Sequence, residues 1–330
     1  MTTRKLATIG KRSANKKMRI LVIGATGLLG RVLVEEWEGD TVRGIGSRDL
    51  DIRDEQHSKE FLRQYRPDWT ILLAAYTDVD GCETNPIRAH EVNCEGAIHI
   101  ARAAGEVGCK LLFLSSDYVF SGLKTTPYET TDETCPINVY GKSKAEAEKS
   151  IQAILPDCCI VRTSWLFGAT GRCFPNTVLG LAKREKRLRV VNDQTGSPTF
   201  NRDVAKAIVK LVRSDAQGIY HVSNSGECTW YDFTRELVRI AGLRDVSVEA
   251  ISTGDMPRPA RRPKYSALSN SSLEKHGIRM RPWQTTVLDY MVERGGTSQS
   301  AAGVVLGPNL ANPSGANPST ANPTKSRKQS

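Results

Sequence analysis

The sequence of 330 residues has no long hydrophobic run, and no apolar stretch approaches the ~20 residues that a membrane-spanning helix requires. We therefore expect no membrane partner. The eight cysteines form no Cys-x-x-Cys pair, and none lies with histidines at a familiar zinc spacing. We interpret them as reduced, small hydrophobic residues of a cytoplasmic protein, and we expect no metal site.

Acidic residues are missing from both ends of the chain. Residues 1–17 carry six Lys or Arg and residues 295–330 carry three, with no acid in either segment. The net charge of +10 therefore leaves 10 − 6 − 3, about +1, for residues 18–294, which gives no argument for a nucleic-acid partner. We expect both ends to be disordered, because they have little to bury. For residues 1–17 the alternatives are a targeting segment and a start codon upstream of the true one.

The segment of residues 18–30 organises the rest of the chain. Residues 20–23 are wholly apolar, as in the middle of a parallel sheet, and Gly24, Gly27 and Gly30 follow at three-residue intervals before an expected helix. Glycines at such a turn permit a tight exit from the strand, a close approach of the backbone to a pyrophosphate, and close packing of helix on strand. Glycine-rich turns also occur without a ligand, but this one lies between a strand and a helix. Its spacing resembles that of the short-chain dehydrogenase/reductase superfamily.

The end of the second expected strand bears on the choice of cofactor. Residues 41–46 form that strand, and Ser47 and Arg48 follow it. In NAD-binding proteins an acid at this place hydrogen-bonds the ribose, whereas a hydroxyl and a guanidinium suit a 2′-phosphate better. We therefore favour NADPH. The alternative is that Arg48 faces solvent and Asp49 or Asp51 reaches the ribose, which would favour NADH.

Strands alternate with helices along the first half of the chain, as in an α/β fold with a doubly wound, parallel Rossmann-type sheet. We expect further strands over residues 69–75, 110–116 and 160–167, and helices over residues 55–65 and 86–107. The dinucleotide-binding domain then covers residues 18–165. Shorter strands alternate with helices over residues 166–294, which indicates a smaller, partly interleaved α/β substrate domain. Ligands should lie at the carboxyl ends of the parallel strands.

Tyr140 and Lys144 are the candidate catalytic pair. They stand four residues apart at the start of a strongly helical segment, so their side chains share one helical face. A tyrosine donates its proton poorly at neutral pH, and we expect the neighbouring ammonium to lower its pKa. Ser116 ends the preceding strand and could orient a substrate carbonyl beside the phenol. An exposed surface pair is the alternative interpretation.

A closer resemblance appears in motifs spread over both halves. The chain resembles the dTDP-4-dehydrorhamnose reductase family over about residues 18–290, in residues 114–122, 136–144, 162–168, 192–199, 218–221 and 258–263. The resemblance implies that Ser116, Tyr140 and Lys144 are catalytic. Many members have threonine where Ser116 stands, so the hydroxyl is kept and the methyl group is not.

The resemblance also implies the binding residues. We expect the cofactor to contact Gly24, Thr26, Gly27, Leu28, Leu29, Gly30, Ser47, Arg48, Asp51, Ile52, Ala74, Ala75, Tyr76, Asn93, Tyr140 and Lys144. We expect the substrate to contact Thr77, Val79, Asp80, Ser116, Asp117, Trp165, Gln194, Arg261 and Arg262. The two arginines suit a bidentate clamp on a diphosphate, and Trp165 suits either a sugar platform or the core.

The sequence thus predicts an NAD(P)H-dependent reductase of a nucleotide-linked 4-keto-6-deoxy sugar. The expected partner is that nucleotide sugar, and a homo-oligomer is compatible with the sequence. Two alternatives come from other classes. A non-catalytic NADP-binding subunit, like the regulatory subunit of methionine adenosyltransferase, shares much of the pattern. A dehydratase or epimerase is disfavoured, because a dehydratase would carry an acid pair after the hydroxyl residue and here Tyr118 follows Asp117.

Overall fold

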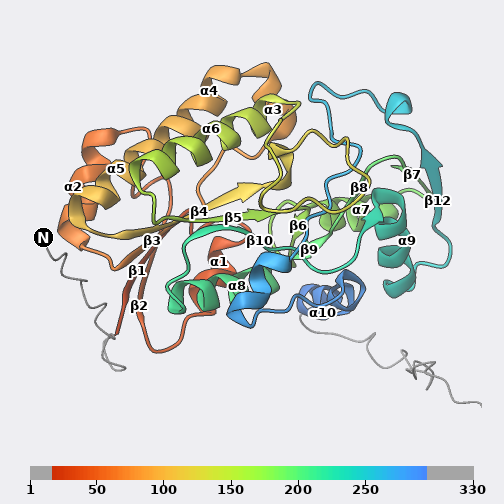
Figure 1. Ribbon diagram of the computed structural model, residues 1–330. Helices are drawn as coiled ribbons and strands as arrows, with labels where there is room; N and C mark the ends of the chain where they lie inside the picture. Colours follow the sequence, from red (N-terminus) through yellow and green to blue (C-terminus); the bar gives the residue numbers. More distant parts are fainter. Residues whose placement is uncertain (1–16, 296–330) are drawn as a thin grey trace, which may run out of the picture. The chain divides into compact units, whose positions relative to one another are not determined.

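The computed structural model describes residues 17–295, which lie in one compact unit (Figure 1). We expected disorder over residues 1–17 and 295–330, and of these, residues 1–16 and 296–330 lie outside the described residues. The strands are β1 (Arg19–Ile23), β2 (Thr41–Ile45), β3 (Trp69–Leu72), β4 (Lys110–Ser116), β5 (Cys159–Thr163), β6 (Leu166–Phe167), β7 (Arg187–Val191), β8 (Thr195–Gly196), β9 (Thr199–Phe200), β10 (Gly218–His221), β11 (Cys228–Thr229) and β12 (Ser247–Ile251). The α-helices are α1 (Gly30–Glu35), α2 (Glu55–Tyr65), α3 (Val79–Thr84), α4 (Pro86–His90), α5 (Gly96–Val107), α6 (Val139–Ile154), α7 (Phe174–Ala182), α8 (Asn201–Arg213), α9 (Trp230–Ile240) and α10 (Trp283–Gly295). The remaining helical turns are η1 (Glu91–Glu95), η2 (Asp117–Val119), η3 (Thr253–Asp255) and η4 (Ser271–His276).

A six-stranded parallel sheet forms the centre, with the strand order β10-β5-β4-β3-β1-β2. The chain first moves outward from β1 to β2 and then returns past β1 to β3. The direction of winding therefore reverses between β1 and β3, and in open α/β sheets this reversal opens a crevice at the carboxyl ends of the strands. The α/β, doubly wound fold expected from the sequence is confirmed.

Helices cover both faces of this sheet (Figure 1). Along β1, Ile20 and Val22 pack with α1 and α8 in one buried cluster, whereas Leu21 and Ile23 pack with α2, α5 and α6 in another. Successive side chains of a strand point to opposite faces, so a wholly apolar strand requires this double cover. The sheet is thereby covered on both faces, and the loops after its strands emerge at the carboxyl edge.

Two expected elements are interrupted. The helix expected over residues 86–107 consists of α4, the π-helical turn η1 and α5, and the buried side chain of Asn93 lies within η1. The strand expected over residues 160–167 ends at Thr163 and resumes as β6. Between the two, Trp165 adopts a left-handed backbone conformation with φ of 43°, which the extended backbone of a strand excludes. Neither interruption could be predicted from the apolar residues of these segments.

The chain after β6 contributes both to the central sheet and to a separate buried cluster. Part of it returns to the central sheet, because β10 pairs with β5 and α8 packs against α1. The rest forms a third buried cluster, in which α7, α9 and α10 surround Phe167 and Phe233 beside the pair β7–β12. The division at residues 165 and 166 into two domains stays a prediction.

No helix within residues 17–295 is long and apolar enough to cross a membrane.

Candidate active site

A cavity of about 1000 Å³ opens at the carboxyl ends of the central strands. Its walls come from the glycine turn after β1, the ends of β2, β3 and β4, the start of α6, and the segment around Trp165. Binding cavities for small molecules commonly occupy this edge of α/β sheets. Residues far apart in the sequence, such as Gly24 and Trp230, therefore face one space.

The glycine turn lines one end of the cavity. Gly24 has φ of +95°, and a Cβ placed there would lie 2.6 Å from the backbone nitrogen of Ala74. A Cβ on Gly30 would lie 2.2 Å from the carbonyl oxygen of Gly24, so α1 approaches β1 as closely as it does only because residue 30 has no side chain. The turn thus presents backbone rather than side chains to the cavity. Thr26, Gly27, Leu28 and Leu29 line it as well.

The end of β2 places the residues that would select the cofactor. Ser47 lines the cavity, whereas Arg48 is exposed and does not. Asp49 accepts a hydrogen bond from the backbone nitrogen of Gly46 at 2.8 Å, so its carboxylate closes the turn. Asp51 also lines the cavity, and Arg53 binds it in a fork that lowers the pKa of its carboxyl group. The selection of NADPH by Arg48 stays a prediction.

The loop after β3 forms a second wall, and Ala74, Ala75, Tyr76 and Thr77 line it. The buried Asn93 fixes this loop from η1 although it does not itself line the cavity. Its side-chain oxygen accepts a hydrogen bond from the backbone nitrogen of Tyr76 at 2.7 Å, and its amide nitrogen donates to the carbonyl oxygen of Tyr76 at 3.1 Å and to Ser143 on α6 at 3.1 Å. Asn93 therefore positions the loop rather than presenting its own side chain.

Ser116 and Asp117 lie at the end of β4, and both are buried and line the cavity. The Ser116 hydroxyl donates to Oδ1 of Asp117 at 2.9 Å and accepts from the backbone nitrogen of Tyr118 at 3.2 Å. Oδ2 of Asp117 is buried without a hydrogen-bond partner. Burial raises the pKa of the Asp117 carboxyl group to about 7. Ser116 is therefore held by a carboxyl group that changes charge near neutral pH.

Tyr140 and Lys144 reach the cavity from the first turns of α6. The side chain of Asn138 caps this helix by accepting from the backbone nitrogen of Gly141 at 2.7 Å. We expected the lysine to lower the pKa of the tyrosine, and this direction is wrong. Burial, followed by the charge of Asp117, raises the pKa of Tyr140, and the Ser116 hydroxyl opposes this only in part. Burial also lowers the pKa of Lys144 to about 7.

Aromatic side chains form a further wall of the cavity. The rings of Trp165 and Trp230 stack with centroids 3.4 Å apart and planes 5° apart, and Phe174 lies against Trp230 at 4.4 Å. All three line the cavity together with Arg172. The wall presents a large apolar face with one cation beside it.

Four residues expected to contact the substrate do not line the cavity. Asp80 forms ion pairs with Arg262 and Arg258 and accepts from the backbone nitrogen of Ala260, so it attaches this arginine-rich segment to α3. Arg261 is exposed, and its carbonyl oxygen accepts from Asn138 at 2.8 Å. Gln194 is buried and donates to Thr253 at 2.9 Å. The diphosphate clamp and the role of Gln194 stay predictions. Val79, also expected on the substrate side, does line the cavity.

Sequence reasoning did not identify several lining residues, which are Arg53, Arg88, Tyr118, Thr163, Ser164, Arg172, Phe174 and Trp230. No motif in the sequence marks most of them, because their places depend on how the second half of the chain folds back. Tyr118 could have been identified from the sequence, because it directly follows Ser116 and Asp117.

A Rossmann-type sheet, a Gly-x-x-Gly-x-x-Gly turn, and Ser116, Tyr140 and Lys144 around one cavity define the class as a short-chain dehydrogenase/reductase, and the chain is an oxidoreductase. The family model described as the RmlD substrate binding domain matches residues 18–294. The chain belongs to this family, that of the dTDP-4-dehydrorhamnose reductases.

Relatives and solved structures agree with this membership. The chain is 38% identical to the spore coat polysaccharide biosynthesis protein SpsK of Bacillus subtilis, over 84% of this chain and 98% of SpsK. It is 37% identical to a dTDP-4-dehydrorhamnose reductase of Mycobacterium tuberculosis, over 83% of this chain and 92% of that protein. A structure of the Bacillus anthracis dTDP-4-dehydrorhamnose reductase in complex with NADP, 35% identical, superposes with a TM-score of 0.82 over 84% of this chain and 100% of that one.

Proposed function

We propose that the protein reduces a nucleotide-linked 4-keto-6-deoxy sugar with NADPH, and that dTDP-4-dehydrorhamnose is the substrate that best fits. One observation carries the proposal: Ser116, Tyr140 and Lys144 line the same cavity as the glycine turn. The relatives named as dTDP-4-dehydrorhamnose reductases support the substrate class. A relative named dTDP-4-keto-6-deoxy-D-glucose reductase, from Streptomyces niveus and 36% identical, keeps the sugar within the same chemical class.

The residues present fit a dinucleotide. A side chain at Gly24 or Gly30 would collide with backbone, so the turn keeps its amide groups free to approach a pyrophosphate. Ser47, Asp51, Tyr140 and Lys144 all line the cavity. We assign Ser47 and Asp51 to the adenosine of the cofactor, and Tyr140 and Lys144 to its nicotinamide. When bound, the reduced nicotinamide supplies the hydride that reduces the sugar carbonyl.

The chain's own contribution is to bind, orient and protonate. Tyr140 donates its phenolic proton to the oxygen of the reacting carbonyl, and Ser116 donates a hydrogen bond to the same oxygen. For this Ser116 turns its hydroxyl proton from Asp117 toward the substrate. Lys144, when protonated, stabilises the phenolate that Tyr140 leaves behind. Proton transfer of this kind typically contributes about 10²–10⁴-fold to the rate.

The aromatic wall and Arg172 are suited to the nucleotide sugar. Trp165 and Trp230 offer a flat apolar face to a base or a sugar ring, and Arg172 offers a guanidinium to a diphosphate. Arg88, which lies over the ring of Tyr76 at 5.0 Å, adds a second cation to the cavity lining. The cavity therefore offers an aromatic face to the base or the sugar ring of the proposed substrate, and guanidinium groups to its diphosphate.

Incubating the purified full chain with NADPH and dTDP-4-dehydrorhamnose, and following the loss of NADPH absorbance, tests the proposal. We expect turnover to dTDP-rhamnose, and none with the sugar nucleotide omitted. Tight NADPH binding without turnover of any 4-keto sugar nucleotide would instead favour the non-catalytic NADP-binding subunit. Turnover of a 4-keto-6-deoxyglucose nucleotide but not of dehydrorhamnose would keep the reaction class and change the substrate.

A further inference from the structure

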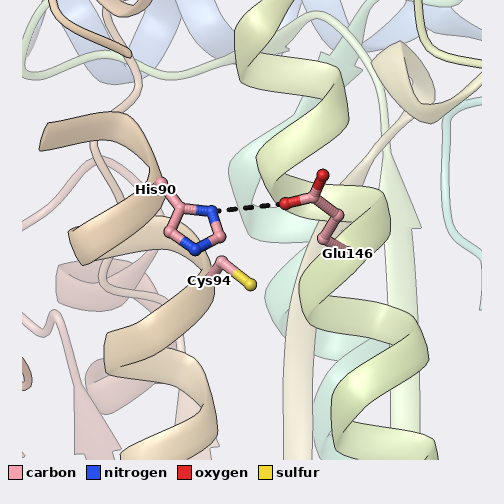
Figure 2. Close-up of side chains that lie close together, drawn as sticks. All are labelled: His90, Cys94 and Glu146. Atoms are coloured by element: carbon pink, nitrogen blue, oxygen red, sulfur yellow. Dashed lines mark ion pairs between the residues drawn. The ribbon is translucent and has the colours of Figure 1, made fainter. Parts of the chain in front are cut away.

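His90, Cys94 and Glu146 lie together at the junction of α4, η1 and α6, away from the cavity lining (Figure 2). Each offers one ligand atom, and these three atoms lie within 4.8 Å of one another. His90 and Glu146 are exposed and Cys94 is buried beneath them. We propose that these residues form a zinc site that ties the π-helical turn η1 to the catalytic helix α6.

The spacing of the ligand atoms suits a tetrahedral ion. Bonds of about 2.0–2.3 Å at tetrahedral angles place neighbouring ligand atoms about 3.3–3.8 Å apart. Nδ1 of His90 already lies 3.3 Å from Oε2 of Glu146. Figure 2 shows the Cys94 side chain below these two groups, with its sulfur turned toward α6, and the three ligand atoms lie within 4.8 Å of one another. The other separations are at most 4.8 Å, so ion binding requires the exposed Glu146 and His90 side chains to rotate toward the sulfur.

Glu95 provides a further polar partner for the histidine. Its Oε1 lies 3.8 Å from Nε2 of His90, on the side of the ring opposite the nitrogen that faces Glu146. Histidines that ligate a metal through one ring nitrogen usually donate the other N–H to a carboxylate or carbonyl, which fixes the tautomer and the ring orientation. The arrangement of Glu95, His90 and Glu146 therefore matches the pattern of a metal-bound histidine as well as that of a surface ion pair.

The helical geometry explains why the sequence conceals the site. His90 and Cys94 are four residues apart, and the turn between them is closed by a bond from the Gly96 nitrogen to the Glu91 carbonyl. In a turn with i→i+5 bonds, residues four apart lie more nearly above one another than in an α-helix, and such turns occur often at functional sites. Glu146 comes from α6, so the third ligand is remote in sequence. Our expectation of no metal site considered only local spacing.

The chemical types of the three ligands indicate which metal ion the site would bind. A thiolate, an imidazole and a carboxylate suit zinc, whereas Mg²⁺ and Ca²⁺ prefer six or more oxygen ligands. On binding, the Cys94 thiol releases its proton to solvent, so that one thiolate and one carboxylate balance the charge of Zn²⁺. Three protein ligands leave the fourth position to water. The bound ion would brace η1, whose Asn93 holds the Tyr76 loop and contacts Ser143 beside Lys144.

Titration of the full chain with Co²⁺ tests the site, because a thiolate ligand to Co²⁺ gives a charge-transfer absorption band. The chain outside residues 17–295 contains no His, Cys, Asp or Glu, so it offers no competing side chain of these types. We expect one equivalent of Co²⁺ to develop the band, Zn²⁺ to displace it, and excess Mg²⁺ to leave it unchanged. Bound Zn²⁺ should raise the unfolding midpoint by about 3–8 °C at a hundred-fold excess over Kd.

Four variants separate the site from adventitious binding. Cys94→Ser should abolish the band, and Glu146→Gln, at an exposed position that leaves the fold intact, should weaken Co²⁺ binding at least tenfold. Glu95→Gln should weaken it less than Glu146→Gln does, as expected for an orienting residue. Cys135→Ser, which removes an exposed cysteine elsewhere, should change nothing. No band at one equivalent of Co²⁺, or a band that survives both Cys94→Ser and Glu146→Gln, would overturn the proposal.

Discussion

The ammonium nitrogen of Lys144 lies 3.9 Å from the centre of the Phe113 ring, inside the protein. The lysine side chain is 2% exposed, and burial lowers its pKa to about 7. The face of the aromatic ring attracts the cation, and the carboxylate of Glu148 raises the pKa in the same sense, but neither offsets the loss of water. A lysine is thus kept where its charge destabilises the folded state, which indicates a role in the site rather than in the fold.

The substitution Lys144→Met should therefore stabilise the protein and inactivate it. The pKa of Lys144 is lower in the folded than in the unfolded state, so wild-type stability from this group is least below pH 7 and recovers up to about pH 10.5. We expect the variant to gain on the order of 2 kcal/mol in unfolding free energy at pH 6–7, and progressively less toward pH 10. Urea unfolding at pH 6, 8 and 10 measures this. A variant less stable than wild type at pH 6 would contradict it.

Removal of the proposed proton donor should separate chemistry from binding. Tyr140→Phe keeps the ring that meets Tyr118 edge-to-face at a centroid distance of 6.0 Å, but removes the hydroxyl. We expect kcat to fall by about 10² or more while the Kd for NADPH stays within twofold. Tyr65→Phe, on α2, removes a hydroxyl remote from the cavity and serves as the control. Near-normal turnover by Tyr140→Phe would dispose of the assignment.

The sequence predicted the parts of the site that depend on local geometry. Gly24 and Gly30 are required by one strand-turn-helix unit, and Tyr140 and Lys144 share a face of one helix, so spacing alone indicates them. The class of fold follows from the alternation of strands and helices for the same reason.

What depends on packing between distant segments was not predictable. The guanidinium of Arg262 pairs with Asp80, 182 residues earlier in the chain, and no local pattern indicates this contact. Trp230 could not be assigned to the cavity, because its place depends on how α9 packs beside the interrupted strand at Trp165. The direction of the pKa shift at Tyr140 was misjudged because burial, which outweighs the neighbouring charge, is a property of the fold.

The cofactor preference of the enzyme tests our interpretation of the residues that follow β2. Arg48 is exposed beside Ser47, and Asp49 is engaged with the Gly46 nitrogen, so a 2′-phosphate would find a hydroxyl and a guanidinium there. We expect Arg48→Ala to raise KM for NADPH several-fold and to leave KM for NADH nearly unchanged, since a charge-assisted hydrogen bond contributes about 1.5–3 kcal/mol when shielded and about 0–1 kcal/mol when exposed. Arg63→Ala on α2 is the control. Equal changes for both cofactors, or a wild-type preference for NADH, would refute the assignment.

Substitutions in the aromatic wall should change KM for the sugar nucleotide and leave KM for NADPH unchanged. Trp165→Ala removes the ring that stacks on Trp230, and loss of one aromatic stacking partner costs about 0.5–1.5 kcal/mol beyond the area it buries. We expect KM for the sugar nucleotide to rise about tenfold, with KM for NADPH unchanged as the internal control. Trp230→Ala should have a smaller effect in the same direction. A change in KM for NADPH of the same size would show that the wall belongs to the cofactor.

The pH dependence of Asp117 provides the last test. Its pKa is raised on folding to about 7, so the folded state binds this proton more tightly than the unfolded state does, and the contribution of Asp117 to stability falls as pH rises from about 4 to 7. Asp117→Asn keeps an acceptor for the Ser116 hydroxyl and removes the charge. The variant should therefore gain unfolding free energy relative to wild type across this range and hold the gain above pH 7. Asp132→Asn should instead lose a nearly constant amount of unfolding free energy above about pH 4, because the hydrogen bond with Lys124 lowers the pKa of the Asp132 carboxyl group and moves its titration below this range. Parallel stability curves for wild type and Asp117→Asn would show that Asp117 does not titrate in this range.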